Sequence, residues 1–478
     1  MANLQDLPLE LVVIILDCTD DASTLRDCCL VSKRLGTIAQ SLLYQYFIQT
    51  LPSSPHSLQH PLGLLTRTLV SCSRLGGNVR DLDIDASDEH DPDNNLGRSP
   101  PQYSGEILKT NDISRVLGLY DGDIKAFIDK IRRFPSMSRD AWLHSLQLEP
   151  NLLTLLLLLH TPNLRRLVIS VDQLSLNSLN SLVRISHGGI PGLSFMGNLK
   201  RLHLRCPTAD QGNKVVLSDI MPLLFLPCLE QLWIDRCSED DADESFLTQL
   251  FNIPPGTLSV TMISFRQSCV GAASIQMLIR ACKALRSFRY NIGTSNAIQF
   301  NPEELYSALY DQRNNLEDVR VNLSSMEQDF APTWKDRDYG SFYEFDKLKT
   351  LSVDQPFLKD LSDFPPSLRH LFLQGCQSPV FQAMSHVSAQ SIGGLLPLLT
   401  EVSLFSDVLY PGRMLDLPSR GATDLLFDES CEKLSGLFFG TNVDLQFESG
   451  LFEKTVDDYD FAFNYGIPGT FWPLVSLG

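Results

Sequence analysis

The sequence has few basic residues and no cysteine pattern of the kind that binds metals or forms a disulfide framework. Lys and Arg number 39 against 57 Asp and Glu, which gives a net charge of −18. Because phosphate groups and anionic membranes are bound through basic surface, this balance argues against nucleic acid and membrane as partners. The eleven cysteines include no C-x-x-C pair, and Cys and His do not cluster at zinc-ligand spacing. We therefore expect free thiols, a reducing compartment and no bound metal.

Long apolar runs, a targeting segment and catalytic motifs are also missing. The longest apolar run, Leu152 to Leu159 with one Thr inside, is far shorter than the about 20 residues that a bilayer span requires. Residues 1–10 lack the basic and apolar stretches of a secretory signal, which predicts a cytoplasmic or nuclear location. There is no nucleophile elbow, phosphate-binding loop, zinc-protease motif or dinucleotide fingerprint. We therefore expect no catalytic site and no cofactor, and interpret the acidic run Ser238 to Glu244 as a solvated loop, since it lacks calcium-loop spacing.

The first fifty residues predict three short helices. Pro8 suits the first turn of the first helix, polar residues between 20 and 24 can cap the second, and Ser32 can cap the third. From Leu35 to Phe47 the apolar residues recur at spacings of three and one, which is the pattern of a helical stripe. Three helices of this size cannot bury so much apolar surface among themselves. We therefore expect another molecule to cover part of it.

The segments "LPLELVVIIL" and "LRDCCLVSKRLGTIA" resemble the F-box motif. In that family a three-helix module docks onto a Skp-type adaptor, which links it to a cullin ubiquitin ligase. The resemblance covers residues 4–48 and combines two separate signatures, Leu-Pro-x-Glu-Leu and Leu-Val-Ser-Lys-Arg-Leu. It implies that the adaptor-binding residues are Leu7, Pro8, Glu10, Leu11, Ile15, Leu16, Leu30, Val31, Ser32, Lys33 and Leu35.

The rest of the chain contains a recurring L-x-x-L-x-L unit. Clear copies begin at Leu164, Leu199, Leu229, Leu285, Leu316, Leu348, Leu368 and Leu399, and weaker ones begin at Val79 and Leu258. Helical patterns precede several copies, and Asn301 to Glu304 reads as a helix start with a cap, a proline and two acids. The units resemble the leucine-rich repeats that often follow an F-box. We predict an α/β fold in which the three-helix F-box precedes an irregular leucine-rich-repeat solenoid, with parallel strands on the concave side and helices on the convex side.

This pattern divides the chain into three parts. We expect an F-box domain at residues 1–50, a leucine-rich-repeat-like solenoid at residues 51–445 and a C-terminal capping segment at residues 446–478. The polar segment 85–105, rich in Pro, Gly and Asp, is predicted to be a disordered insertion.

Side chains alternate along a strand, so the third and fifth positions of each repeat point to the concave face. Arg occurs on or near that face repeatedly and Trp once, at Trp233, and these are the residue types most enriched in binding hot spots. The candidate substrate-binding residues are Arg201, His203, Arg205, Trp233, Arg289 and Arg320. An acidic or phosphorylated segment is the ligand this set favours. The alternative interpretation is that the arginines only pair with Asp235 and Asp318 on neighbouring strands. Separately, we expect the side chains of His203 and His370 at the surface.

These resemblances imply the substrate-recognition subunit of a Skp–cullin–F-box ubiquitin ligase. Such a subunit binds the Skp-type adaptor through the F-box and an unidentified protein substrate through the repeats, and has no chemistry of its own. A non-ligase scaffold bound to the adaptor, or a general protein-interaction protein, is the alternative. A hydrolase carried on the solenoid is a further class, but no constellation of residues supports it.

Overall fold

The computed structural model describes the chain in separate stretches. They are residues 7–19, 21–48, 65–66, 68–69, 72–84, 152–170, 179, 183, 196–206, 215–239, 253–293, 301–323, 339–358, 364–376, 380–405 and 432–448. The predicted insertion at 85–105, residues 240–244 of the acidic loop and residues 449–478 of the predicted capping segment lie outside these stretches.

The chain forms two compact units, and each is described by itself. The first comprises residues 1–215, 219–229 and 467–478, and the second comprises residues 216–218 and 230–466. Within the described stretches, twelve strands form parallel β-sheet, four of them in the first unit and eight in the second. Helices accompany the strands in both units. The predicted mixed α/β class is therefore confirmed.

Three helices open the first unit: α1 (Leu9–Asp17), α2 (Ala22–Val31) and α3 (Lys33–Leu43). The Asp21 side chain caps α2 by accepting hydrogen bonds from the backbone N–H groups of Ser23 and Thr24, at 3.1 and 2.9 Å. The Ser32 hydroxyl caps α3 by accepting from the N–H of Leu35 at 3.2 Å. The three predicted helices and two of their predicted caps are thus confirmed, and their shared hydrophobic core consists of Val12, Leu16, Leu25, Leu35, Ile38 and Ala39.

The sequence pattern predicted a third helix that continues to Phe47, which is longer than the helix in the structure. It ends at Leu43, and Tyr46 and Phe47, which we placed on its apolar stripe, belong to strand β1 (Tyr46–Ile48). The carbonyl oxygen of Gln45 accepts hydrogen bonds from the N–H groups of Arg80 and Asp81. Aromatic and β-branched residues favour strands when a neighbouring strand is available to pair with. Pairing with a segment distant in sequence therefore overrides the local helical pattern.

The remaining elements of the first unit continue from β1. Its parallel strands, in spatial order, are β1, β2 (Asp81–Ile84), β3 (Arg166–Ser170) and β4 (Arg201–Arg205). The described stretches of this unit also contain the short helices α5 (Ser73–Gly76), α9 (Leu152–Leu159) and α11 (Leu217–Leu224), the last beginning in residues assigned to the second unit. Leu82, Leu167 and Leu202 align across neighbouring strands and are fully buried, as the repeat pattern predicted.

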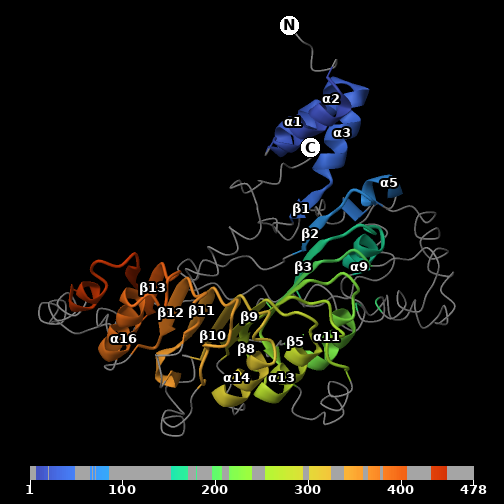
Figure 1. The fold of residues 1–478 in the computed structure, drawn as a ribbon. Helices are drawn as coiled ribbons and strands as arrows, with labels where there is room; N and C mark the ends of the chain where they lie inside the picture. The colour runs from blue at the N-terminus through green and yellow to red at the C-terminus, as the bar shows by residue number, and fades with distance from the viewer. Residues whose placement is uncertain are drawn as a thin grey trace, which may run out of the picture. The chain divides into compact units, whose positions relative to one another are not determined.

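The second unit contains the longer series of parallel strands. In spatial order they are β6 (Gln231–Asp235), β8 (Met262–Ser268), β9 (Ser287–Ile292), β10 (Asp318–Asn322), β11 (Thr350–Asp354), β12 (His370–Gln374), β13 (Glu401–Phe405) and β14 (Asp444–Glu448). The helical elements are α13 (Ala272–Ala281), α14 (Pro302–Tyr310), the single turn η4 (Gln355–Phe357) and α16 (Val380–Ile392). A further short strand of this unit is β7 (Cys237–Ser238), and the residues of β5 (Val215–Val216) are divided between the two units. In Figure 1, α13, α14 and α16 lie along one side of this strand series.

The fourth position of each repeat forms a continuous buried row in the second unit. The strand register aligns Leu232, Ile263, Phe288, Val319, Leu351, Leu371 and Val402, and each is 0% exposed. The start of α14 is also as predicted, because the Asn301 side chain accepts a hydrogen bond from the N–H of Glu303 at 3.2 Å.

One repeat is displaced from its predicted position. We began the weak copy at Leu258, which would put Met262 at its fifth position. The register instead aligns Met262 with Gln231 and Ser287, which are third positions, so the repeat begins two residues later at Val260. Leu258 and Val260 are both buried, and apolarity alone could not separate the two registers.

The buried row gives a direct test of the register. Replacing Leu371 with Ala should lower the free energy of unfolding by about 2–5 kcal/mol, because the cavity is enclosed by neighbouring strands on both sides. Replacing exposed Leu395 with Ala is the matched control and should cost less than about 0.5 kcal/mol. Urea unfolding followed by circular dichroism measures both. Equal effects of the two substitutions would contradict the register.

Candidate interaction surfaces

Helix α1 exposes much of its apolar surface. Its sequence, LELVVIILD, is apolar at every position except Glu10 and Asp17. Val12 and Leu16, one turn apart, fill the core of the three helices, whereas Ile14 is 57% exposed. A helix that is apolar on all sides is normally buried on all sides. The outer face of α1 therefore has the character of a surface that another molecule covers.

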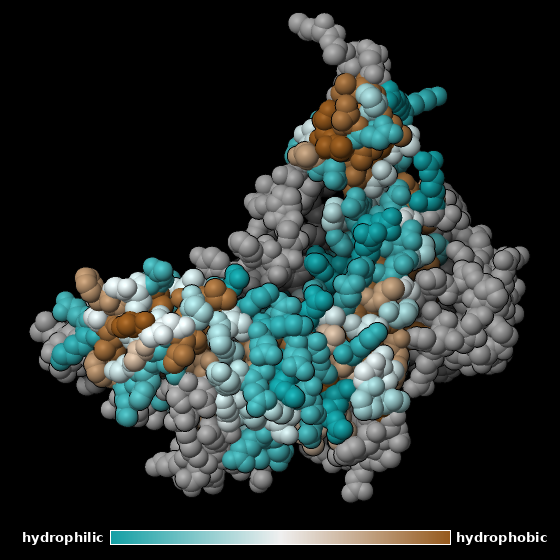
Figure 2. Space-filling model, viewed as in Figure 1, coloured by the Kyte–Doolittle hydropathy of each residue, from teal (hydrophilic) through white to brown (hydrophobic). Residues whose placement is uncertain are grey.

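The end of helix α2 adds to this exposed apolar surface. Leu30 is 83% exposed and Val31 is 65% exposed. We call the set Leu9, Leu11, Ile14, Ile15, Leu30 and Val31 the α1–α2 apolar surface. Figure 2 shows hydrophobic residues gathered on these N-terminal helices.

The predicted adaptor-binding residues divide between this surface and the core. Pro8, Glu10, Leu11, Ile15, Leu30, Val31 and Lys33 are exposed, and Leu7 and Ser32 are half-buried. Leu16 and Leu35 are buried among the three helices, so they hold the module together rather than reach a partner. Leu9 and Ile14 are exposed as well and were not among the predicted residues. The almost wholly apolar sequence of α1 could have predicted that these two residues are exposed, because one helix face cannot bury them all.

The predicted substrate residues of the first unit lie on strand β4 and are not an open surface. Arg201 and Arg205 are half-buried, and His203, which we expected at the surface, is only 3% exposed. The register places His203 beside the fully buried Val168 on β3. On the adjacent strands, the largely buried Arg166 and Asp83 approach to 3.7 Å between guanidinium and carboxylate. The polar side chains of this strand series are therefore enclosed and partly paired within the unit.

The second unit has a polar face made by the third and fifth positions of its strands. Its fifth-position row runs Trp233, Ser264, Arg289, Arg320, Ser352, Phe372, Ser403 and Gln446. Its third-position row runs Gln231, Met262, Ser287, Asp318, Thr350, His370, Glu401 and Asp444. Trp233, Arg289 and Arg320 thus lie in one row of one unit, apart from the three candidates of the first unit. We call this surface the polar face.

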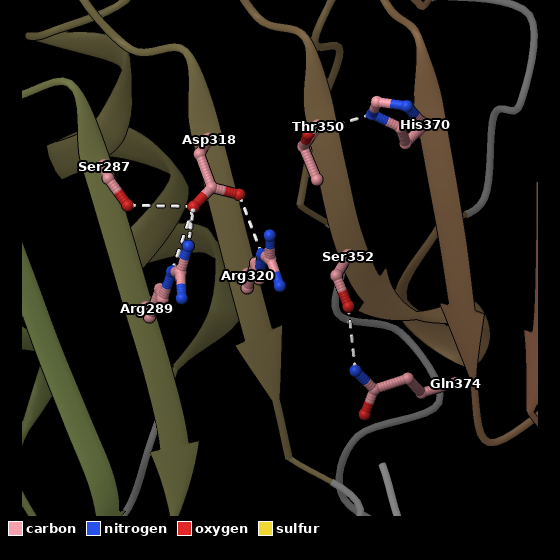
Figure 3. Close-up of polar contacts among 8 residues, drawn as sticks. All are labelled: Ser287, Arg289, Asp318, Arg320, Thr350, Ser352, His370 and Gln374. Carbon is pink, nitrogen blue, oxygen red and sulfur yellow. Dashed lines mark hydrogen bonds and ion pairs between the residues drawn. The ribbon is translucent and has the colours of Figure 1, made fainter. Parts of the chain in front are cut away.

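Asp318 binds both predicted arginines of the polar face (Figure 3). Its Oδ2 accepts hydrogen bonds from Nε and Nη2 of Arg289, at 2.9 and 2.8 Å, and from the Ser287 hydroxyl at 2.9 Å. Its Oδ1 accepts from Nε of Arg320 at 2.8 Å. The alternative interpretation from the sequence, pairing with Asp318 on a neighbouring strand, is confirmed for Arg289, whereas Arg320 pairs with Asp318 along their own strand, β10. Asp235 instead lies 4.0 Å from Nε of Arg266, an arginine that we had not considered.

The Asp318 carboxylate is held in its charged form by these contacts. Burial by itself raises its pKa, but the charges of Arg289 and Arg320 and their hydrogen bonds outweigh burial and lower the pKa to about 2. A carboxyl group whose pKa is lower in the folded state stabilises that state once it is ionised in both states. The cluster is therefore a structural ion pair across β9 and β10.

Neutral contacts connect the next strands of the polar face. The Thr350 hydroxyl lies 3.4 Å from Nδ1 of His370, and Nε2 of Gln374 donates to the Ser352 hydroxyl at 2.8 Å (Figure 3). The Phe372 ring lies beside His370, with 6.5 Å between ring centroids. Charge in the two rows of this face is thus concentrated on β9–β10 and on β13–β14, and hydroxyl, amide and aromatic groups lie on the strands between them.

Within the described stretches, no three side chains among His, Cys, Asp and Glu come together as a metal site. The ten cysteines in these stretches carry free thiols. None of the helices described is both long and apolar enough to cross a membrane. No protein-family model matches the chain, and no curated protein matches it.

The ion-pair cluster predicts a pH dependence. Asp318→Asn should lower the free energy of unfolding by at least about 2 kcal/mol at pH 7, because two largely buried guanidinium groups lose their carboxylate. Since the folded-state pKa is below the ordinary value of 3.8, wild type should lose this advantage as the pH falls from about 5 toward 2. Unfolding midpoints at several pH values measure the difference. The control is Asp346→Asn, which replaces an exposed carboxylate of the same unit. It should not reproduce the pH-dependent difference in unfolding midpoint between wild type and Asp318→Asn.

Proposed function

We propose that this protein is an F-box substrate receptor of a Skp–cullin–F-box ubiquitin ligase. The α1–α2 apolar surface is the observation that carries the proposal. It lies on a three-helix module whose sequence resembles the F-box motif, and it is exposed where that family binds its adaptor. Full burial of side chains such as Leu30 and Ile15 contributes roughly 1.5–3 kcal/mol each, which is enough in sum to hold a partner.

The second part of the proposal is that the strand series is a leucine-rich-repeat solenoid. Its strands begin at the L-x-x-L-x-L units, run parallel and carry helices on one side (Figure 1). The repeat consensus has Asn or Cys eight residues after the first leucine. Cys237 and Cys376 stand there, counted from Leu229 and Leu368, and both are buried. The Cys376 thiol donates to the carbonyl oxygen of Leu373 at 3.3 Å, as a residue turning the chain at the end of a strand would.

In this proposal the two parts perform separate tasks and neither carries out chemistry. The helical module binds a Skp-type adaptor and through it a cullin, and the polar face of the solenoid, on its concave side, binds the protein substrate. Tethering both in one assembly raises the effective concentration of a substrate lysine near the ubiquitin-charged enzyme. The location that follows is cytoplasmic or nuclear, where such ligases act.

The proposal predicts that polar substitutions on the α1–α2 apolar surface abolish adaptor binding without unfolding the chain. Leu30→Asp with Val31→Asp should reduce co-purification of a Skp-type adaptor by at least about tenfold, because charge would have to be buried in an apolar interface. The matched control is Ile392→Asp with Leu395→Asp, two exposed apolar residues of the second unit. Unchanged capture by the Leu30/Val31 variant, at equal expression and melting temperature, contradicts the docking role.

A reconstituted complex distinguishes a ligase from a non-ligase scaffold. The chain, adaptor, cullin and a ubiquitin-charged enzyme should together transfer ubiquitin to a protein captured by the polar face. Adaptor binding with no transfer to any captured protein would favour the scaffold.

A further inference from the structure

The residues immediately before strands β2, β3 and β4 of the first unit are all basic. They are Arg80, Arg165 and Lys200. Their backbones are joined directly, because the N–H of Arg165 donates to the carbonyl oxygen of Arg80 at 2.7 Å and the N–H of Lys200 donates to that of Arg165 at 2.8 Å. Arg165 and Lys200 are exposed, and Arg80 is half-buried. We call these three residues the basic row.

The corresponding positions in the second unit show what such side chains can do. Lys349, immediately before β11, lies 2.5 Å from Glu317, immediately before β10, between Nζ and Oε2. Side chains at this position can therefore meet across neighbouring strands. The row of the second unit mixes acids, bases and threonines, and from β6 to β13 it runs Glu230, Thr261, Arg286, Glu317, Lys349, Arg369 and Thr400. The basic row has one sign of charge only.

The next residues along the same three strands add to the positive charge. The register aligns Asp81, Arg166 and Arg201 beside one another. Together with the basic row they comprise five cations and one anion, in a chain whose net charge is −18. Burial raises the pKa of that one acid, Asp81, and the charges of Arg166, Arg201 and Arg165 act to lower it.

Packing of the first unit does not by itself require this arrangement. Like charges beside each other on neighbouring strands destabilise a sheet. Nη1 of Arg80 donates to a neutral group, the carbonyl oxygen of Asn163, at 3.3 Å. Because Arg165 and Lys200 reach the solvent, an anionic group of a partner can approach both.

We propose that the basic row binds a short acidic segment of another protein through its carboxylate groups. The proposed function gives these three residues no role. The sequence favoured an acidic ligand on the third and fifth positions of the repeats, where Arg289 and Arg320 bind Asp318. The exposed cations instead lie at the second position, one residue before each strand begins.

The dimensions of the row define the ligand. Strands lie about 4.8 Å apart, so the three cations extend over about 10 Å. An extended peptide rises about 3.3 Å per residue, and a run of about three or four acidic residues spans the same distance. Each exposed ion pair contributes little by itself, so several must form together. A long polyanion such as a nucleic acid is less suitable, because the net negative charge of the chain repels it beyond the row.

Short synthetic peptides and the full-length chain test this preference. One peptide has about four consecutive glutamates in a Gly/Ser background, and two matched peptides have glutamines or lysines instead. Fluorescence anisotropy should show about tenfold tighter binding of the glutamate peptide than of the glutamine peptide, and the difference should shrink as salt is added. Equal binding of these two peptides overturns the proposal, as does tighter binding of a single-stranded DNA of the same net charge.

Charge reversal shows whether the basic row is the binding surface. Arg165→Glu with Lys200→Glu should weaken the glutamate peptide about tenfold and should bind the lysine peptide more tightly than wild type does. A misfolded variant would not show this exchange of preference. Loss of binding without the exchange contradicts the assignment.

The matched control makes the same change of charge in the second unit. Arg286→Glu with Arg369→Glu alters two exposed residues that stand immediately before β9 and β12. Because they lie away from the basic row, this variant should change the affinity for either peptide by less than about twofold. The same exchange of preference in the control would show a general effect of net charge and would overturn the proposal.

Adaptor capture by the same preparation separates this inference from the proposed function. Selective binding of the glutamate peptide by a chain that captures no Skp-type adaptor would support the basic-row inference and refute the ligase role. Adaptor capture without that selectivity would refute the inference and leave the ligase role standing.

Discussion

Lateral burial between neighbouring parallel strands is the interaction on which the rest of the structure depends. Seven strands of the second unit each contribute one fully buried side chain to a single row, from Leu232 on β6 to Val402 on β13. A repeat of this size cannot bury its apolar side chains alone, so each gains stability only when the strands beside it are aligned. The alignment that closes this row also fixes which side chains share the opposite face. The polar face is therefore a consequence of core packing.

Alignment also explains why charged side chains collect as they do. Asp318 lies 29 residues from Arg289 in the sequence, yet its carboxylate binds the Arg289 guanidinium. It also binds the guanidinium of Arg320, which lies two residues further along the same strand. Because the site is largely buried, pairing is needed to offset the cost of removing these charges from water. The carboxylates of Glu401 and Asp444 sit nearer the end of the strand series, where water reaches them more easily. They tolerate a like-charged neighbour there because solvent weakens the repulsion between the two charges.

The two candidate surfaces differ in their physical character. The α1–α2 apolar surface offers apolar area and little charge, which suits a permanent or high-affinity partner. The polar face offers ordered charges, hydroxyl groups and aromatic rings, which give selectivity more than raw affinity. In the proposed receptor this division has a direct use, since the adaptor is held constantly while substrates are chosen and released.

The sequence by itself determined the element types and most of their positions. The helices with their capping residues Asp21, Ser32 and Asn301, and the strands at the clear L-x-x-L-x-L copies, follow from local side-chain chemistry and were predictable. The predictions that were wrong or missing depended on contacts between distant segments. Tyr46 and Phe47 belong to a strand that pairs with β2, and the repeat near residue 260 begins two residues later than predicted. Strand β14 was not predicted, because its sequence has no clear repeat motif. The same distinction applies to the polar face, where some features could be predicted from the sequence and others could not. Arg289 and Arg320 could be placed on one face by the alternation of strand side chains, but their shared carboxylate and the pairing of Glu401 with Asp444 required the register. A strand pattern is local, whereas the partner beside each residue is decided only when the strands pack together.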